Sequence, residues 1–176
     1  MNNNSKNLVR SALLLAIAII IQSIGRNIPQ ISQLFVGSIV NTILIIAAFV
    51  CGTSLAICVG ALTPLLAWLI GQLPAPMGPF VPFIMIGNAL LILVFGIIKN
   101  DSTIRQIIGI ILGSLCKFLF LYLSASKLIN LLNINLPSKI AKKLIIMMGL
   151  PQLITALIGG FIALILVNIM KKRKAL

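Results

Sequence analysis

The sequence is nearly without acidic side chains and wholly without histidine. Asp101 is its only acidic residue among 176. Proton- and sodium-coupled carriers bind their coupling ion through intramembrane Asp, Glu or His, because these groups titrate or offer negative oxygens. Paired-carboxylate hydrolysis, Ser-His-Asp catalysis and histidine-ligated metal sites lack their parts for the same reason. We therefore expect no enzyme, no cofactor, no metal site and no ion-coupled carrier.

Two further signals are missing from the chain. No stretch reads G-x-x-x-x-G-K-[ST], so the chain has no phosphate-binding loop with which to hydrolyse ATP. The three cysteines, Cys51, Cys58 and Cys116, are odd in number and have neither C-x-x-C spacing nor other ligand residues beside them. We interpret them as small apolar side chains. If the protein drives transport, another subunit supplies the energy.

What the chain does have is apolar surface and positive charge. It is 60% hydrophobic and 9% charged, with a mean hydropathy of +1.21, which is typical of a multi-pass protein of the cell membrane. The net charge of +13 sits mostly at the ends of apolar runs, where it faces the lipid headgroups of the bilayer. No basic stripe is interleaved with solvent-facing aromatics, so a nucleic-acid partner is not expected.

The apolar runs predict the fold class. A hydrocarbon core of about 30 Å needs roughly 20 apolar residues in a helix. We predict an all-α membrane protein with one domain over residues 1–176, a bundle of six transmembrane helices at about 8–24, 35–50, 54–70, 83–98, 103–124 and 150–170.

Two connections between these segments are distinctive. The stretch 71–82 contains four prolines, which forbid helix there and predict a short rigid cap. The stretch 127–143 predicts a short interfacial helix, with Pro137 and Ser138 as its start and three lysines after them.

Lysine and arginine near the segment ends predict the orientation. With both termini in the cytoplasm, the inner side receives Lys6, Arg10, Lys99, Arg105 and the basic run 171–174. The outer side then holds Arg26, Lys127, Lys139, Lys142 and Lys143, and these outer lysines are the weak point of the arrangement.

Lys117 is the most informative polar residue inside a segment. It lies about 12 Å from the outer end of the fifth segment, at 1.5 Å per residue. Asp101 lies near the opposite face, so no carboxylate of the chain can pair with it. Lys117 is therefore neutral, solvated by a cavity, satisfied by carbonyls or lipid phosphate, or bound to a ligand.

Other polar residues fall at a similar depth. Asn41, Asn88 and Gln152 lie in the outer half with Lys117, and together they predict one polar pocket beneath the proline-rich cap. Gln72, Trp68 and Tyr122 lie near its rim, where they could add hydrogen bonds or a stacking face. The competing interpretations are interhelical hydrogen bonds for Asn41 and Asn88 and an interfacial aromatic belt for Trp68 and Tyr122.

The first segment carries Ala12 and Ala16 four residues apart, a spacing that lets another helix approach closely. With this pattern the chain resembles the substrate-binding S components of energy-coupling factor (ECF) transporters over essentially its whole length. The resemblance rests on Ala12-x-x-x-Ala16, Asn88 in Ile86-Gly87-Asn88-Ala89, Lys117 in Lys117-Phe118-Leu119-Phe120, and Pro151-Gln152-Leu153.

The resemblance implies more than the composition does. It implies a small six-helix protein that captures a vitamin or related micronutrient from outside, in its outer half, for ATP-driven uptake. It implies docking through Ala12 and Ala16 onto a transmembrane T component that carries two cytoplasmic ATPases. The absence of a pocket carboxylate argues against a cationic ligand such as thiamin, and the deep lysine favours an anionic or carbonyl-rich molecule, such as a pantothenate-like acid or a flavin. Neutral ligands stay open as well, because amides dominate the proposed site and bind them equally well.

Two other classes of function stay open at this point. A self-sufficient channel or facilitator would assemble through the alanine face and line a pore with Asn88 and Lys117. A non-transporting scaffold or accessory subunit would use its polar residues only to hold helices together.

Overall fold

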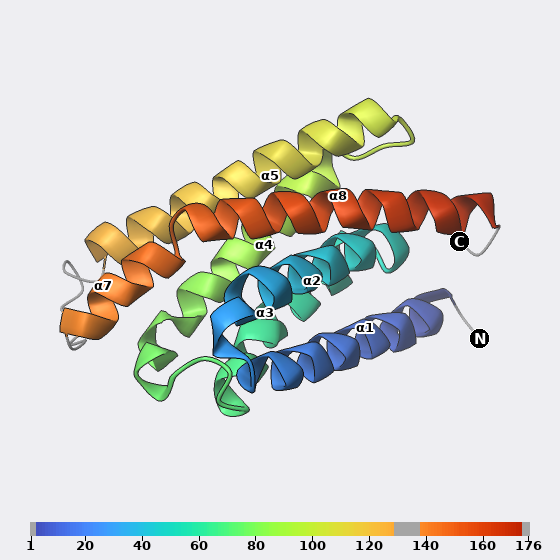
Figure 1. Ribbon diagram of the computed structural model, residues 1–176. Coiled ribbons are helices and arrows are strands. Elements are labelled where there is room, and N and C mark those ends of the chain that lie inside the picture. The colour runs from blue at the N-terminus through green and yellow to red at the C-terminus, as the bar shows by residue number, and fades with distance from the viewer. Residues whose placement is uncertain (1–2, 129–137, 174–176) are drawn as a thin grey trace.

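All regular elements that the structure describes are helical. The computed structural model describes residues 3–128 and 138–173, and within these the side chains of all residues except 29–32, 128 and 138–141. The elements are α1 (Asn3–Arg26), α2 (Pro29–Val50), α3 (Thr53–Leu69), the 3-10 helix η1 (Ala75–Phe80), α4 (Val81–Ile98), α5 (Thr103–Leu123), the π-helical turn η2 (Ser124–Leu128), α7 (Ser138–Met147) and α8 (Leu150–Lys172) (Figure 1).

Five stretches of helix are long and apolar enough to cross a membrane, namely Asn3–Arg26, Gln33–Val50, Ala75–Ile98, Thr103–Lys127 and Lys142–Lys172. The remaining apolar helix, α3, has 17 residues, so at 1.5 Å per residue it spans about 25 Å of a core of about 30 Å. The all-helical membrane fold is confirmed, whereas a count of six transmembrane helices is not established by length alone.

The long helices form one bundle around α2. This helix packs against α1, α3 and α8, while α4 lies between α3 and α5, and α5 also contacts α8. The central core consists of buried aliphatic and aromatic side chains of α2, α3, α4, α5 and α8, among them Leu44, Ile92, Phe95, Ile110 and Leu164. Helix α1 stands at the edge of the bundle (Figure 1).

The two ends of the bundle differ in content. Both termini lie at one end, here named the termini end, with the α2–α3 and α4–α5 turns (Figure 1). The loop end, opposite to it, carries η1, η2, α7 and the turn into α8. The connections that the sequence predicts to be distinctive therefore lie together at the loop end.

Three expectations about local structure need correction. Helices α1 and α2 begin at Asn3 and Pro29, earlier than predicted, because each helix also includes the polar residues that precede its apolar run. The prediction that the proline cluster excludes helix was wrong, since residues 75–80 form η1 and Pro82 stands in the first turn of α4. Proline is tolerated in a first turn because its missing N–H has no helical partner there.

The helix expected within 127–143 begins at Ser138, where the sequence predicts its start. It is α7, and it continues past Lys143 to Met147. Pro137 and the rest of residues 129–137 lie outside the described part of the chain.

Candidate functional site

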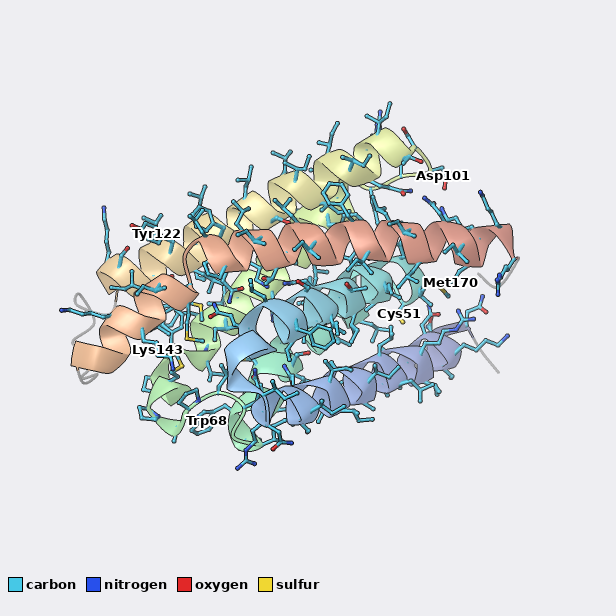
Figure 2. All side chains as sticks on the ribbon, viewed as in Figure 1. Cys51, Trp68, Asp101, Tyr122, Lys143 and Met170 are labelled. Carbon is cyan, nitrogen blue, oxygen red and sulfur yellow. The ribbon has the colours of Figure 1, made fainter. Side chains whose placement is uncertain are left out.

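A cavity of about 390 Å³ lies toward the loop end of the bundle. Six amide side chains line it, those of Gln22, Gln33, Asn41, Gln72, Asn88 and Gln152. Three basic side chains also line it, those of Arg26, Lys117 and Lys143, and the remaining lining is Thr63 with apolar, glycine and proline residues. No acidic residue lines the cavity, because the only one in the chain, Asp101, lies at the termini end (Figure 2).

Lys117 is buried in the middle of the bundle, with 3% of its surface exposed. It belongs to the face of α5 that also buries Gly113, Ser114 and Leu121. Its Nζ donates a hydrogen bond of 2.7 Å to Oδ1 of Asn41 on α2. The partner is a neutral amide, so the hydrogen bond satisfies one N–H of the ammonium group without balancing its charge.

Asn41 is held in place by α2 and α8. Its Nδ2 donates to the backbone oxygen of Gly37 at 2.9 Å and to Oγ1 of Thr155 at 3.4 Å. Thr155 donates in turn to the backbone oxygen of Gln152 at 3.2 Å. The chain of hydrogen bonds therefore runs from α5 through α2 to α8, and it fixes the amide oxygen that faces Lys117.

Asn88 joins α4 to α3. Its Nδ2 donates to the backbone oxygen of Gly60 at 2.9 Å. In a regular helix that oxygen would accept from the N–H of residue 64, which is Pro64 and has none. The amide of Asn88 thus satisfies a carbonyl that the proline leaves without its helical donor.

The other predicted site residues divide into two groups. Gln72 and Gln152 line the cavity, and Gln152 also places Nε2 3.7 Å from Sδ of Met148. Trp68 and Tyr122 do not line it. Trp68 donates from Nε1 to the backbone oxygen of Ala75, while Tyr122 is exposed and stacks on Phe118.

The structure thus brings five of the seven predicted site residues into one cavity. Contact of any of them with a substrate stays a prediction.

Sequence reasoning missed several lining residues, among them Gln22, Arg26 and Gln33. Arg26 donates from Nη1 to the backbone oxygen of Ile70 at 2.9 Å, and Gln33 donates from Nε2 to the backbone oxygen of Met147 at 2.8 Å. Gln22 lies four residues before Arg26, so both occupy one face of α1. A glutamine inside an apolar segment was the signal available for Gln22, whereas the contacts of Gln33 depend on α7, which is distant in sequence.

Ala12 and Ala16 lie on the outside of the bundle. The side of α1 that faces the other helices carries Ser11, Ala18, Gln22 and Gly25, all buried. Both alanines are exposed. Together they leave a shallow strip along α1 on which no described helix packs.

The cavity offers hydrogen-bond donors and acceptors together with basic side chains and no acidic one, which suits binding of a small molecule. Among the described residues, no group of three His, Cys, Asp or Glu side chains could hold a metal ion.

Comparison with known proteins identifies the family. A family model described as the substrate-specific component of ECF transporters matches residues 6–170. No curated protein and no solved structure matches the chain. The match runs from the first turn of α1 to near the end of α8 and covers nearly the whole of the chain. The protein belongs to the family of substrate-specific components of ECF transporters.

Proposed function

We propose that the protein captures a vitamin or related micronutrient from outside the cell and holds it in the cavity at the loop end. One observation carries the assignment of the site: a buried lysine lines the cavity, and no acidic side chain among the described residues lies beside it. Its volume of about 390 Å³ lies within the range of about 300–1,000 Å³ typical of small-molecule sites.

The proposed orientation places the loop end outside and both termini in the cytoplasm, with α3 as the sixth and shortest crossing. Basic residues near the helix ends support this arrangement, since Lys6, Arg10, Lys99, Arg105 and Lys171 lie toward the termini end. A helix of 17 residues can cross where neighbouring helices or local thinning of the bilayer compensate for its length.

The proposed partners are a transmembrane T component and two cytoplasmic ATPases. The ATPases would supply the energy for uptake by hydrolysing ATP. We assign docking to Ala12 and Ala16. The support is that both alanines are exposed and four residues apart, so a partner helix could approach α1 closely.

The test is mass spectrometry of small molecules released when the detergent-purified protein is denatured, comparing the wild type with Lys117→Met. The matched control is Lys127→Met, which makes the same change at an exposed lysine of the loop end. We expect one stoichiometric metabolite from the wild type and the control, and its loss from Lys117→Met.

Other outcomes would contradict the proposal. Release of lipid alone from all three preparations would favour a scaffold or accessory subunit. Saturable flux of a solute through vesicles containing only this chain would favour a channel or facilitator.

A further inference from the structure

The charges around the cavity are unbalanced. Three of its lining residues, Arg26, Lys117 and Lys143, are basic, and none is acidic. Arg26 and Lys143 are exposed, and Arg26 is already bonded to the backbone of Ile70. Water screens exposed charges, so Arg26 and Lys143 need no counter-ion. Lys117 differs from both because it is buried.

A buried ammonium group without a counter-charge is costly, so a lysine in this position either loses its proton or gains an opposite charge or several good hydrogen bonds. The ammonium group of Lys117 has three N–H donors, and Asn41 accepts from it at 2.7 Å. Asp101 cannot reach it from the termini end (Figure 2). A neutral carbonyl on a ligand would accept another N–H and would leave the charge unbalanced.

We propose that the substrate carries an acid group, a carboxylate or a phosphate, that binds Lys117, and that Asn41 positions Lys117 to receive it. This proposal rests on the proposed function, which makes the cavity the substrate site. It also narrows the ligand class, since a neutral carbonyl-rich molecule would supply no negative charge to pair with the ammonium group of Lys117.

Asn41 acts through Lys117. Its amide is oriented by the backbone oxygen of Gly37 and by Thr155, which leaves Oδ1 to accept from Lys117. An aspartate has nearly the same shape as an asparagine. Asn41→Asp would therefore place a carboxylate beside Nζ and balance the charge of Lys117 from within the protein.

The test compares the acid form of the released metabolite with its methyl ester. The metabolite is first treated with a methylating reagent, and mass spectrometry counts the acid groups that react. Binding of the free acid and of the ester is then measured by titration on ligand-depleted wild type, Asn41→Asp and Lys117→Met. The matched control is Asn100→Asp, which makes the same change at an exposed asparagine of the termini end.

We expect the wild type and Asn100→Asp to prefer the acid over the ester by about 10–100-fold, the range for a hydrogen bond between charged groups. We expect Asn41→Asp and Lys117→Met to lose this preference while binding the ester about as well as the wild type does. A structural role of Asn41 alone would weaken the binding of acid and ester equally, so the ratio separates positioning from folding.

The other outcomes contradict the acid group of the substrate, the proposed function or the role of Asn41. A stoichiometric metabolite without an acid group would overturn this inference and leave the proposed function standing. Release of no metabolite, or of a phospholipid in stoichiometric amount, would overturn the proposed function. An acid preference that survives in Asn41→Asp would contradict the role given to Asn41. Should Asn41→Asp not fold, the acid preference of the wild type and its loss in Lys117→Met decide the case.

Discussion

The side-chain amide of Asn88 donates to the backbone oxygen of Gly60 at 2.9 Å, across the interface between α4 and α3. This oxygen lacks its usual helical donor because Pro64 stands four residues later. Gly60 also allows the approach, since a Cβ there would lie 3.3 Å from Cβ of Asn88. The three residues therefore form one unit in which the asparagine compensates for the proline.

The unit predicts strong coupling between Asn88 and Pro64. Asn88→Leu should lower the free energy of unfolding by about 1–3 kcal/mol, because it leaves a buried carbonyl without a partner. In a Pro64→Ala background the helix supplies the missing N–H, so the same change should cost clearly less. Thermal unfolding of the four proteins in detergent completes the double-mutant cycle, and strictly additive effects would contradict the coupling.

The sequence predicted the fold class well because apolar runs decide it. In a bilayer every backbone polar group needs an internal partner, so a run of apolar residues implies a helix. The number of crossings could not be predicted as firmly, since α3 has only 17 residues and its neighbours, not its own length, determine whether it spans. The proline-rich stretch was misjudged for two reasons. A proline in a first turn, such as Pro82, loses no helical hydrogen bond, and the short turns of η1 are closed by the N–H groups of Met77 and Val81, which are not prolines.

The sequence allowed us to predict which polar residues belong to the site better than which partners they contact. Asn41, Asn88 and Lys117 stand out because polar groups inside an apolar segment are costly. Their partners depend on the axial register between helices, which local sequence does not encode. Tyr122 follows Lys117 by five residues, or about 140° around the helix at about 100° per residue, so both could not face one cavity.

Gly159 on α8 lies where α8 packs closely on α2 beside Asn41. A Cβ there would lie 2.7 Å from Cβ of Asn41 and 2.8 Å from the backbone nitrogen of Thr42, so α2 and α8 would have to separate. We expect Gly159→Ala to lower the free energy of unfolding by about 1–3 kcal/mol and to reduce bound metabolite, because Asn41 moves away from Lys117. Chemical unfolding and mass spectrometry measure the two effects.

Gly109→Ala on α5 is the matched control. A Cβ at Gly109 would have its nearest contact with the ring of Phe95 at 3.1 Å, and the helix would gain about 1 kcal/mol in propensity. We expect a small net change in stability and unchanged metabolite content. Equal losses in both variants would show that Gly159 has no special role between α2 and α8.

The exposed alanines of α1 predict that association with the T component can be lost without loss of the bound metabolite. Ala12→Trp and Ala16→Trp each place a large ring on the strip where a partner helix would approach. Co-purification with the T component and its ATPases should be lost, while metabolite content stays at the wild-type level. Ile108→Trp on the exposed side of α5 serves as the control and should keep the complex. Intact complexes with both alanine variants would place the docking surface elsewhere.

Lys99, at the termini end, predicts a dependence of stability on pH. It follows the last residue of α4, donates to the backbone oxygen of Ala48, and lies with Nζ 5.4 Å from the ring centroid of Phe49. Burial lowers the pKa of Lys99 from its ordinary value of 10.5. Between the lowered pKa and 10.5 the unfolded chain binds more protons at this residue than the folded chain does. The free energy of unfolding should therefore rise with pH across that window.

The prediction is measured as the difference in unfolding midpoint between the wild type and Lys99→Met, followed from neutral pH toward pH 10.5. The unfolding midpoint of the wild type should rise relative to that of Lys99→Met as the pH rises. The reason is that deprotonation removes the penalty of keeping a cation partly out of water. Lys6→Met, at an exposed lysine near the start of α1, should show no such gain. If the difference instead falls with pH, the hydrogen bond to Ala48 and the ring of Phe49 stabilise the charged form more than burial opposes it, and Lys99 would act as a cationic clamp between α2 and α4.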